Sequence, residues 1–159
     1  MRQIRITLIV TIAAALAAVA LSQMVFAADT QGQSKFTLVV NDPNGIVVPP
    51  DFFNNLQPNA QGTEDSPLLR DGQTVGLAET VYTVTRVHDG DVAVMIECSI
   101  ELPEGNILFN GTGHLADVQR GIAVPVVGGT GQYAGAKGTV VMNVTSDGNT
   151  NLNFDITSK

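Results

Sequence analysis

The chain is poor in cysteine and in histidine. Cys98 is its only cysteine, so no disulfide can form within the chain and the fold must be stabilised by burial of apolar side chains and by association. Cys98 lies in the alternating segment VAVMIECSIEL with no base nearby in sequence, so we interpret it as a buried apolar side chain rather than a reactive thiol. His88 and His114 are isolated from each other, and the sequence predicts neither a metal site nor another cofactor.

Positive charge is also scarce, which limits the partners of the chain. Eight Lys and Arg stand against fifteen Asp and Glu, and two of the eight, Arg2 and Arg5, fall in the first few residues. Without those two the formal net charge is −9. Such a surface repels nucleic-acid phosphates and anionic lipid headgroups, so we expect no nucleic-acid partner.

The one long hydrophobic run is at the N-terminus, MRQIRITLIVTIAAALAAVALSQMVFA. Positive residues precede the run, and Val25 and Ala27 form a signal-peptidase site, so residues 1–27 are interpreted as an export signal. This predicts a secreted or periplasmic protein of one domain, residues 28–159, with no membrane attachment after cleavage. The alternative is a retained anchor, because the run from Ile6 to Ala20 approaches the roughly 18 apolar residues of a spanning helix.

Beyond residue 27 the sequence has no amphipathic helix pattern. Seven segments instead alternate apolar and polar residues, as strands do: 35–41, 75–87, 91–102, 106–118, 122–127, 138–146 and 151–157. Turn sequences such as HDGD and SDGN join neighbouring segments, and short connections favour antiparallel pairing. The pattern predicts an all-β domain, either a closed barrel or a sandwich. Residues 41–74, rich in proline, predict a long irregular arm, with a further short strand at GIVV as an option.

Residues 126–138, VVGGTGQYAGAKG, contain a possible nucleotide-binding turn. Its GTGQYA matches G-x-G-x-x-A, but a dinucleotide turn must be followed by a helix, and here strand and hairpin residues follow. A phosphate-binding P-loop is excluded as well, because Lys137 is followed by Gly138 instead of Ser or Thr. The glycines therefore predict a connection between two strands, where close backbone approach and positive φ require glycine.

The same segment resembles the signature of plant dirigent proteins, V-V-G-G-T-G-x-F-x-x-A-R-G, and is similar to the G-G-x-G-x-[FY]-x-G-A-x-G segment of allene oxide cyclases. Tyr133 takes the aromatic position, and Lys137 stands where dirigent proteins carry arginine. A second segment, DSPLLRDGQTVGLAETVY (65–82), resembles the dirigent D-D-P-L and V-G-x-A-x-G-x-Y elements, with Thr80 in place of a glycine. The resemblance covers residues 65–145. It implies an antiparallel eight-stranded β-barrel, usually trimeric, with a central apolar cavity.

The resemblance also implies a pocket and candidate catalytic residues, which are Asp65, Tyr82 and Lys137. The alternatives are a turn role for Asp65, an exposed charge at Lys137 and a subunit contact at Tyr82. Lysine keeps the charge of the dirigent arginine but loses its planar fork, so recognition that depends on that fork is not expected.

Further candidates for ligand binding follow from strand alternation. If Tyr82 points inward, alternation places Thr80, Val84 and Arg86 on the same face. Glu97 is a candidate internal acid, with a solvated strand residue as the alternative. The complete predicted ligand-binding set is Thr80, Tyr82, Val84, Arg86, Glu97 and Tyr133.

Three functions are consistent with these features. The first is a barrel that binds a small apolar molecule and guides the stereochemistry of a cofactor-independent cyclisation or coupling, since holding a reactive conformer lowers the entropic barrier. The second is a ligand-binding barrel without turnover, whose mark would be that Asp65, Tyr82 and Lys137 do not converge. The third is a structural barrel filled by side chains, marked by a void of less than roughly 300 Å³.

Overall fold

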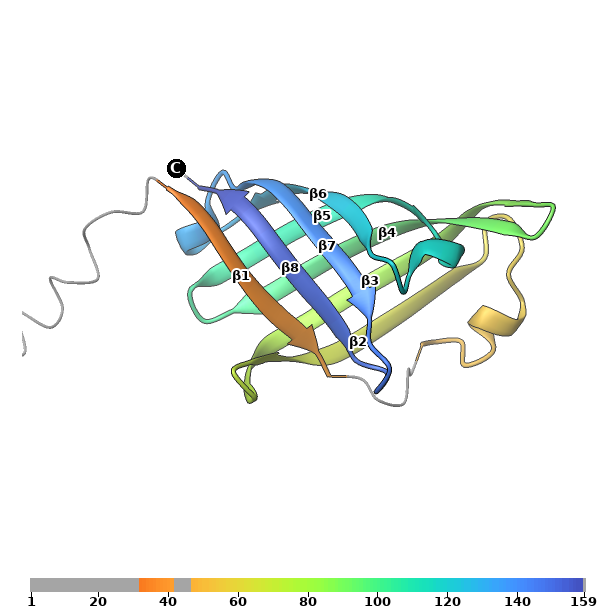
Figure 1. The fold of residues 1–159 in the computed structure, drawn as a ribbon, viewed down its shortest axis with the longest axis horizontal. Helices are drawn as coiled ribbons and strands as arrows, with labels where there is room; N and C mark the ends of the chain where they lie inside the picture. The colour runs from red at the N-terminus through yellow and green to blue at the C-terminus, as the bar shows by residue number, and fades with distance from the viewer. Residues whose placement is uncertain (1–31, 42–46, 159) are drawn as a thin grey trace, which may run out of the picture. The chain divides into compact units, whose positions relative to one another are not determined.

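A computed structural model describes residues 32–41 and 47–158, which form a closed antiparallel barrel (Figure 1). Every strand pairs with the next in sequence, and the last pairs with the first. The strands are β1 (Gln33–Val40), β2 (Gln61–Arg70), β3 (Gln73–His88), β4 (Asp91–Leu102), β5 (Gly105–His114), β6 (Ile122–Gly129), β7 (Lys137–Val144) and β8 (Thr150–Thr157). The predicted eight-stranded barrel is confirmed, and the sandwich is excluded because β8 closes onto β1. The predicted signal peptide lies outside the described residues.

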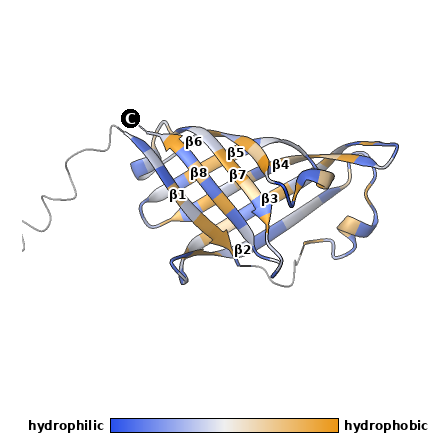
Figure 2. Ribbon diagram, viewed as in Figure 1, coloured by the Kyte–Doolittle hydropathy of each residue, from blue (hydrophilic) through white to orange (hydrophobic). Residues whose placement is uncertain are grey.

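Alternation along each strand separates the core from the surface, as the alternating colours in Figure 2 show. On β8, Leu152, Phe154 and Ile156 are buried, and the residues between them point outward. One of these, Asn153, accepts a hydrogen bond from the Thr37 hydroxyl and donates one to Asn143, on the two neighbouring strands. The period of two therefore places apolar side chains inside the barrel and a polar ladder outside it.

Strand β2 falls inside the stretch that the sequence predicted as an irregular arm. The irregular part of the described chain ends at Ala60, and β2 pairs with β3 along its whole length. Pro67 is compatible with this strand because its neighbour on the β1 side is nearly absent: β1 pairs only with Leu68 and Leu69, and Asn41 N–H donates to the Pro67 carbonyl. The nitrogen of Pro67 points to the same side as its carbonyl, so the missing N–H interrupts no hydrogen bond between β2 and β3.

Aromatic rings fill the barrel toward the end that holds the glycine-rich segment. Phe36 stacks on Phe154 with ring centroids 4.9 Å apart, and Phe109 meets Phe154 edge to face at 6.1 Å. Ile100 and Ile107 are fully buried beside them. This half of the barrel is a packed core.

The glycine-rich segment itself connects β6 to β7, as predicted. A single 3-10 turn, η3 (Gly131–Tyr133), separates the two strands, and no α-helix follows it. A Cβ on Gly129 would lie 2.5 Å from the Asn106 carbonyl oxygen and 2.6 Å from that of Tyr133, so only glycine allows this close approach. We call this end of the barrel the glycine-loop end.

The opposite end carries the β3–β4 hairpin, the turn η2 (Leu115–Asp117) and an irregular segment, residues 47–60, that we call the strap. The strap contains η1 (Phe52–Asn54) and is hydrogen-bonded at both ends: Val48 pairs with Thr63, and Asn59 and Ala60 bond to the backbone of Val84. Part of the GIVV segment lies outside the described residues. Among the described residues there is no helix with the length and apolar character needed to cross a membrane.

Candidate functional site

A cavity of about 240 Å³ lies inside the barrel at the strap end, and we call it the chamber. Its walls are mainly apolar and are formed by residues of every strand except β1, with the strap and the β7–β8 loop around its mouth. The lining residues are Val47, Phe53, Glu64, Tyr82, Val94, Ile96, Gly113, Leu115, Val118, Ile122, Met142, Val144, Gly148 and Thr150. The barrel is therefore packed at one end and hollow at the other.

Two polar groups meet in the wall of this chamber. The Tyr82 hydroxyl donates to Glu64 Oε2 at 2.9 Å, and the buried Ser66 hydroxyl donates to Glu64 Oε1, also at 2.9 Å. Burial, followed by the negative charge of Glu64, raises the pKa of Tyr82 well above its usual value. Tyr82 is therefore a hydrogen-bond donor at neutral pH, and Glu64 is an acceptor with lone pairs to spare.

Aromatic side chains of the strap cover Tyr82. Phe52 is buried, with its ring centroid 6.3 Å from that of Tyr82, and the Phe53 centroid is 6.2 Å from it at a tilted angle. Phe53 also lines the chamber, yet 49% of its surface is exposed, which places it at the mouth. A guest in the chamber would thus meet aromatic rings next to the carboxylate of Glu64.

The side chains of β3 that were predicted to point inward do so as far as Val84, but Arg86 does not. Thr80 donates to the Cys98 sulfur at 3.3 Å, and Val84 is fully buried against the strap, but neither lines the chamber. The register of β3 shifts between Val84 and Arg86, so alternation does not continue past this bulge. Arg86 is exposed and forms an ion pair with Asp91 on the hairpin instead of pointing into the barrel.

Asp65 and Glu97 lie on the outer face of the barrel. Both are exposed, and both line a groove of about 510 Å³ that runs across the outside of the sheet together with Glu79. Asp65 neighbours Glu64 in sequence, but successive side chains of a strand point to opposite faces, so only Glu64 faces the chamber.

Lys137 and Tyr133 belong to the glycine-loop end. Lys137 is the exposed first residue of β7, whereas the chamber-lining Met142 and Val144 come five and seven residues later, about 16 Å or more along the strand. Tyr133 donates to Glu104 Oε1 at 3.1 Å, and Arg70 pairs with the same oxygen at 2.8 Å. Of the three residues implied as catalytic, only Tyr82 lines the chamber, so the three do not converge.

Glu64 is the chamber residue that the sequence analysis missed. Strand alternation would have placed it on the inner face of β2, where Thr80 is its partner on β3 and Tyr82 its diagonal neighbour, but the proline-containing stretch around it was interpreted as irregular. Within the described ranges no three His, Cys, Asp or Glu side chains lie close enough together to hold a metal ion.

The volume of the chamber bears directly on function. It is smaller than the roughly 300 Å³ below which we expected a structural barrel, but an apolar cavity of about 150 Å³ is enough to bind benzene. The chamber can therefore hold a guest of one or two rings, but not a drug-sized molecule.

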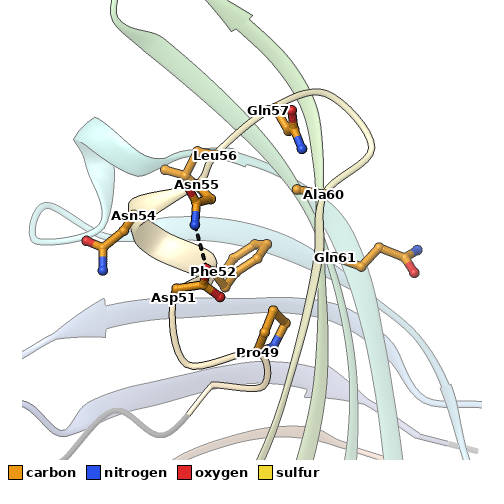
Figure 3. Close-up of a pocket in the computed structure, with 9 residues that line it drawn as sticks. All are labelled: Pro49, Asp51, Phe52, Asn54, Asn55, Leu56, Gln57, Ala60 and Gln61. Atoms are coloured by element: carbon orange, nitrogen blue, oxygen red, sulfur yellow. Dashed lines mark hydrogen bonds between the residues drawn. The ribbon is translucent and has the colours of Figure 1, made fainter.

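A larger pocket, about 600 Å³, lies on the strap (Figure 3). Exposed amide side chains, including Asn54, Asn55 and Gln61, line much of it, and Asn55 donates to Asp51 across the η1 turn. Water competes for these exposed groups, whereas the chamber offers a carboxylate among apolar walls. The chamber is for this reason the better candidate site.

Comparison with known proteins shows the fold and no more. No family profile and no curated protein sequence matches the chain. A solved structure of a pyocyanin demethylase has a TM-score of 0.60 at 24% identity and covers 75% of this chain and 98% of its own. The pterocarpan synthase dirigent protein GePTS1 gives 0.60 at 16%, covering 82% and 91%. AbnU, an exo-specific intermolecular Diels–Alderase, gives 0.62 at 16%, covering 79% and 98%. The chain thus has the barrel fold of a dirigent protein and of Diels–Alderases.

Proposed function

We propose that this barrel binds a small, mostly apolar molecule in the chamber and holds it in one conformation. The observation that carries the proposal is the combination, at one end of the barrel, of an apolar cavity with the hydrogen-bonded pair Tyr82 and Glu64. Ligand sites in proteins are typically apolar cavities with a few polar groups that set orientation. The chamber has this composition, and the packed glycine-loop end does not.

The finer proposal is that the bound conformation directs a cyclisation or coupling without a cofactor. Restricting a flexible substrate to a reactive conformer can supply several kcal/mol of the barrier without covalent catalysis. The similarity in fold to barrels named as a Diels–Alderase and a pterocarpan synthase dirigent protein supports this proposal. In it, Tyr82 and Glu64 orient the substrate by hydrogen bonding, and Asp65 and Lys137 take no part.

Binding without turnover is the second candidate. It is favoured by one specific observation, which is that Asp65, Tyr82 and Lys137 do not converge. Both candidates require an occupied chamber, so binding is the property to measure first. Export rests on residues 1–27 and a trimeric assembly rests on the family resemblance, and both stay predictions.

The experiment measures binding of benzyl alcohol, a one-ring probe with one hydroxyl, by isothermal titration calorimetry. Val144 lines the chamber, and Val141 lies on the outer face of the same strand. We expect Val144→Phe to fill the chamber and weaken binding by about tenfold or more, and Val141→Phe, its matched control, to leave binding unchanged. Equal binding by the wild type and both variants, or no binding by the wild type, would overturn the proposal.

A further inference from the structure

Within residues 32–41 and 47–158 the barrel has a Tyr–Glu pair at each end, and a cation bonds to the pair at the glycine-loop end. At the glycine-loop end, Tyr133 and Arg70 both bond to Glu104, and the Arg70 guanidinium lies over the Phe36 ring, 5.8 Å from its centroid. The phenol, the carboxylate, the cation and the aromatic ring form one closed cluster. Each charged group in it has a partner of opposite charge.

The chamber repeats three of these four groups. Tyr82 donates to Glu64, and the rings of Phe53 and Tyr82 lie beside the cavity. Among the described residues, none forms an ion pair with Glu64, and no Lys, Arg or His lines the chamber. The open volume of the chamber adjoins the Glu64 carboxylate directly.

A carboxylate in an apolar wall gains strongly from a positively charged donor. Its two hydrogen bonds come from the neutral hydroxyls of Ser66 and Tyr82, so its charge is solvated but not balanced. Hydrogen bonds to charged groups are stronger than neutral ones, and aromatic faces attract cations. The acidic charge of the whole chain also draws cations toward it and repels anions.

We propose that the guest of the chamber is an organic cation, an ammonium group on a small apolar skeleton. Its N–H donates to Glu64, and its positive charge lies against the rings of Tyr82 and Phe53, so that the guest completes the cluster that Arg70 completes at the other end. The inference rests on the proposed function, because it names the class of molecule that the same chamber binds. Glu64 is then the residue that determines specificity for charge.

The test compares three probes that share one phenyl ring: benzylammonium, benzyl alcohol and benzoate. Titration calorimetry at pH 7 measures the affinity of each for the full chain. We expect benzylammonium to bind about tenfold or more tightly than benzyl alcohol, and benzoate to bind most weakly because its charge repels Glu64. Ammonium binding at or below the affinity of the alcohol would overturn the inference.

A matched pair of variants assigns the preference to one carboxylate. Glu64→Gln removes the charge in the chamber, and Glu79→Gln makes the same change on the outer face of β3. We expect Glu64→Gln to abolish the preference for benzylammonium over benzyl alcohol and to improve benzoate binding, with no such change in Glu79→Gln. A preference that survives Glu64→Gln, or is lost equally in both variants, would show that the net charge of the protein is responsible and would overturn the inference.

The outcomes also separate this inference from the proposed function. If no probe binds the wild type, the proposed function fails. If the alcohol binds in the chamber but the ammonium has no advantage, the proposed function stands and the inference fails. The order of the three probes on the wild type decides this, even where Glu64→Gln reduces stability.

Discussion

The two ends of the barrel use the same pair of residue types in opposite ways. At the glycine-loop end, Tyr133 and Glu104 are joined by Arg70, whose guanidinium lies over the Phe36 ring. At the strap end, Tyr82 and Glu64 face a chamber of about 240 Å³ and have no such cation. The first pair contributes to stability, and the second is available to a guest.

The difference shows that charge balance, more than the Tyr–Glu pair itself, distinguishes a structural cluster from a candidate site. At Glu104 burial is the largest single influence and raises the pKa, but the hydrogen bond and charge of Arg70, together with hydrogen bonds from the backbone and Tyr133, lower it by more, so that the net pKa lies below its usual value. In the chamber, the pKa of Tyr82 is raised by burial and by an uncompensated neighbour. Buried ionisable groups with a perturbed pKa that line a cavity are candidates for contact with a ligand.

The largest effect is expected at the glycine-loop end, where packing leaves no room. Gly129→Ala would place a Cβ within 2.7 Å of three atoms of Asn106 and Tyr133, two of them carbonyl oxygens, and we expect a loss of about 2–4 kcal/mol in the free energy of unfolding. Gly128→Ala is the matched control, because a Cβ there meets nothing within 4 Å. Urea denaturation measures both. Equal stability of the two variants would show that this end is not tightly packed.

The next prediction concerns a smaller effect, the loss of stability when each of the two carboxylates is neutralised. We expect Glu104→Gln to cost about 1–2 kcal/mol, less than a fully buried ion pair because Arg70 and Glu104 are both partly exposed. Glu64→Gln removes no ion pair, but its amide nitrogen cannot accept one of the two hydrogen bonds that Ser66 and Tyr82 donate to the carboxylate, so we expect a cost of about 1 kcal/mol. Added salt screens an ion pair, so we expect high salt to reduce the cost of Glu104→Gln and to leave that of Glu64→Gln unchanged. Urea denaturation of both variants at low and high salt measures this, and equal salt dependence at both positions would contradict the contrast between the ends.

The smallest effect is the pH dependence of the Glu104 ion pair. The folded-state pKa of Glu104 lies below its ordinary value of 4.5, so the unfolded chain binds this proton more readily than the folded chain. The stabilisation is complete above the unfolded value and is lost as the pH falls through the folded value. We therefore expect the difference in unfolding free energy between wild type and Glu104→Gln to shrink as the pH falls below 4.5 and through the lower folded-state value.

Other carboxylates also have a lowered pKa, such as Asp91, bonded to His114 and Arg86, and Asp155, bonded to Gln33 and Lys35. They are the same in the wild type and in Glu104→Gln, so their contribution to the pH dependence cancels when the two unfolding free energies are subtracted. A difference that stays constant between neutral and acid pH would mean that the charge of Glu104 contributes nothing to stability.

Most of the barrel could be predicted because a half-buried strand alternates its side chains with a period of two. The strand β2 was missed because Pro67 and the polar run before it are typical of loops, and their compatibility with a strand depends on how little of β2 is paired with β1. That one omission also concealed Glu64. In the same way, nothing in the local sequence marks the bulge that turns Arg86 out of the barrel.

The sequence by itself determined the all-strand architecture and the strand-to-strand role of the glycine-rich segment, because each depends on residues close together in the chain. Only the tertiary structure decided where the barrel is hollow and which residues meet there. The chamber brings together residues from Val47 to Thr150, and Lys137 lies at the opposite end from Tyr82. Such distances depend on the register and closure of eight strands, which local patterns do not encode.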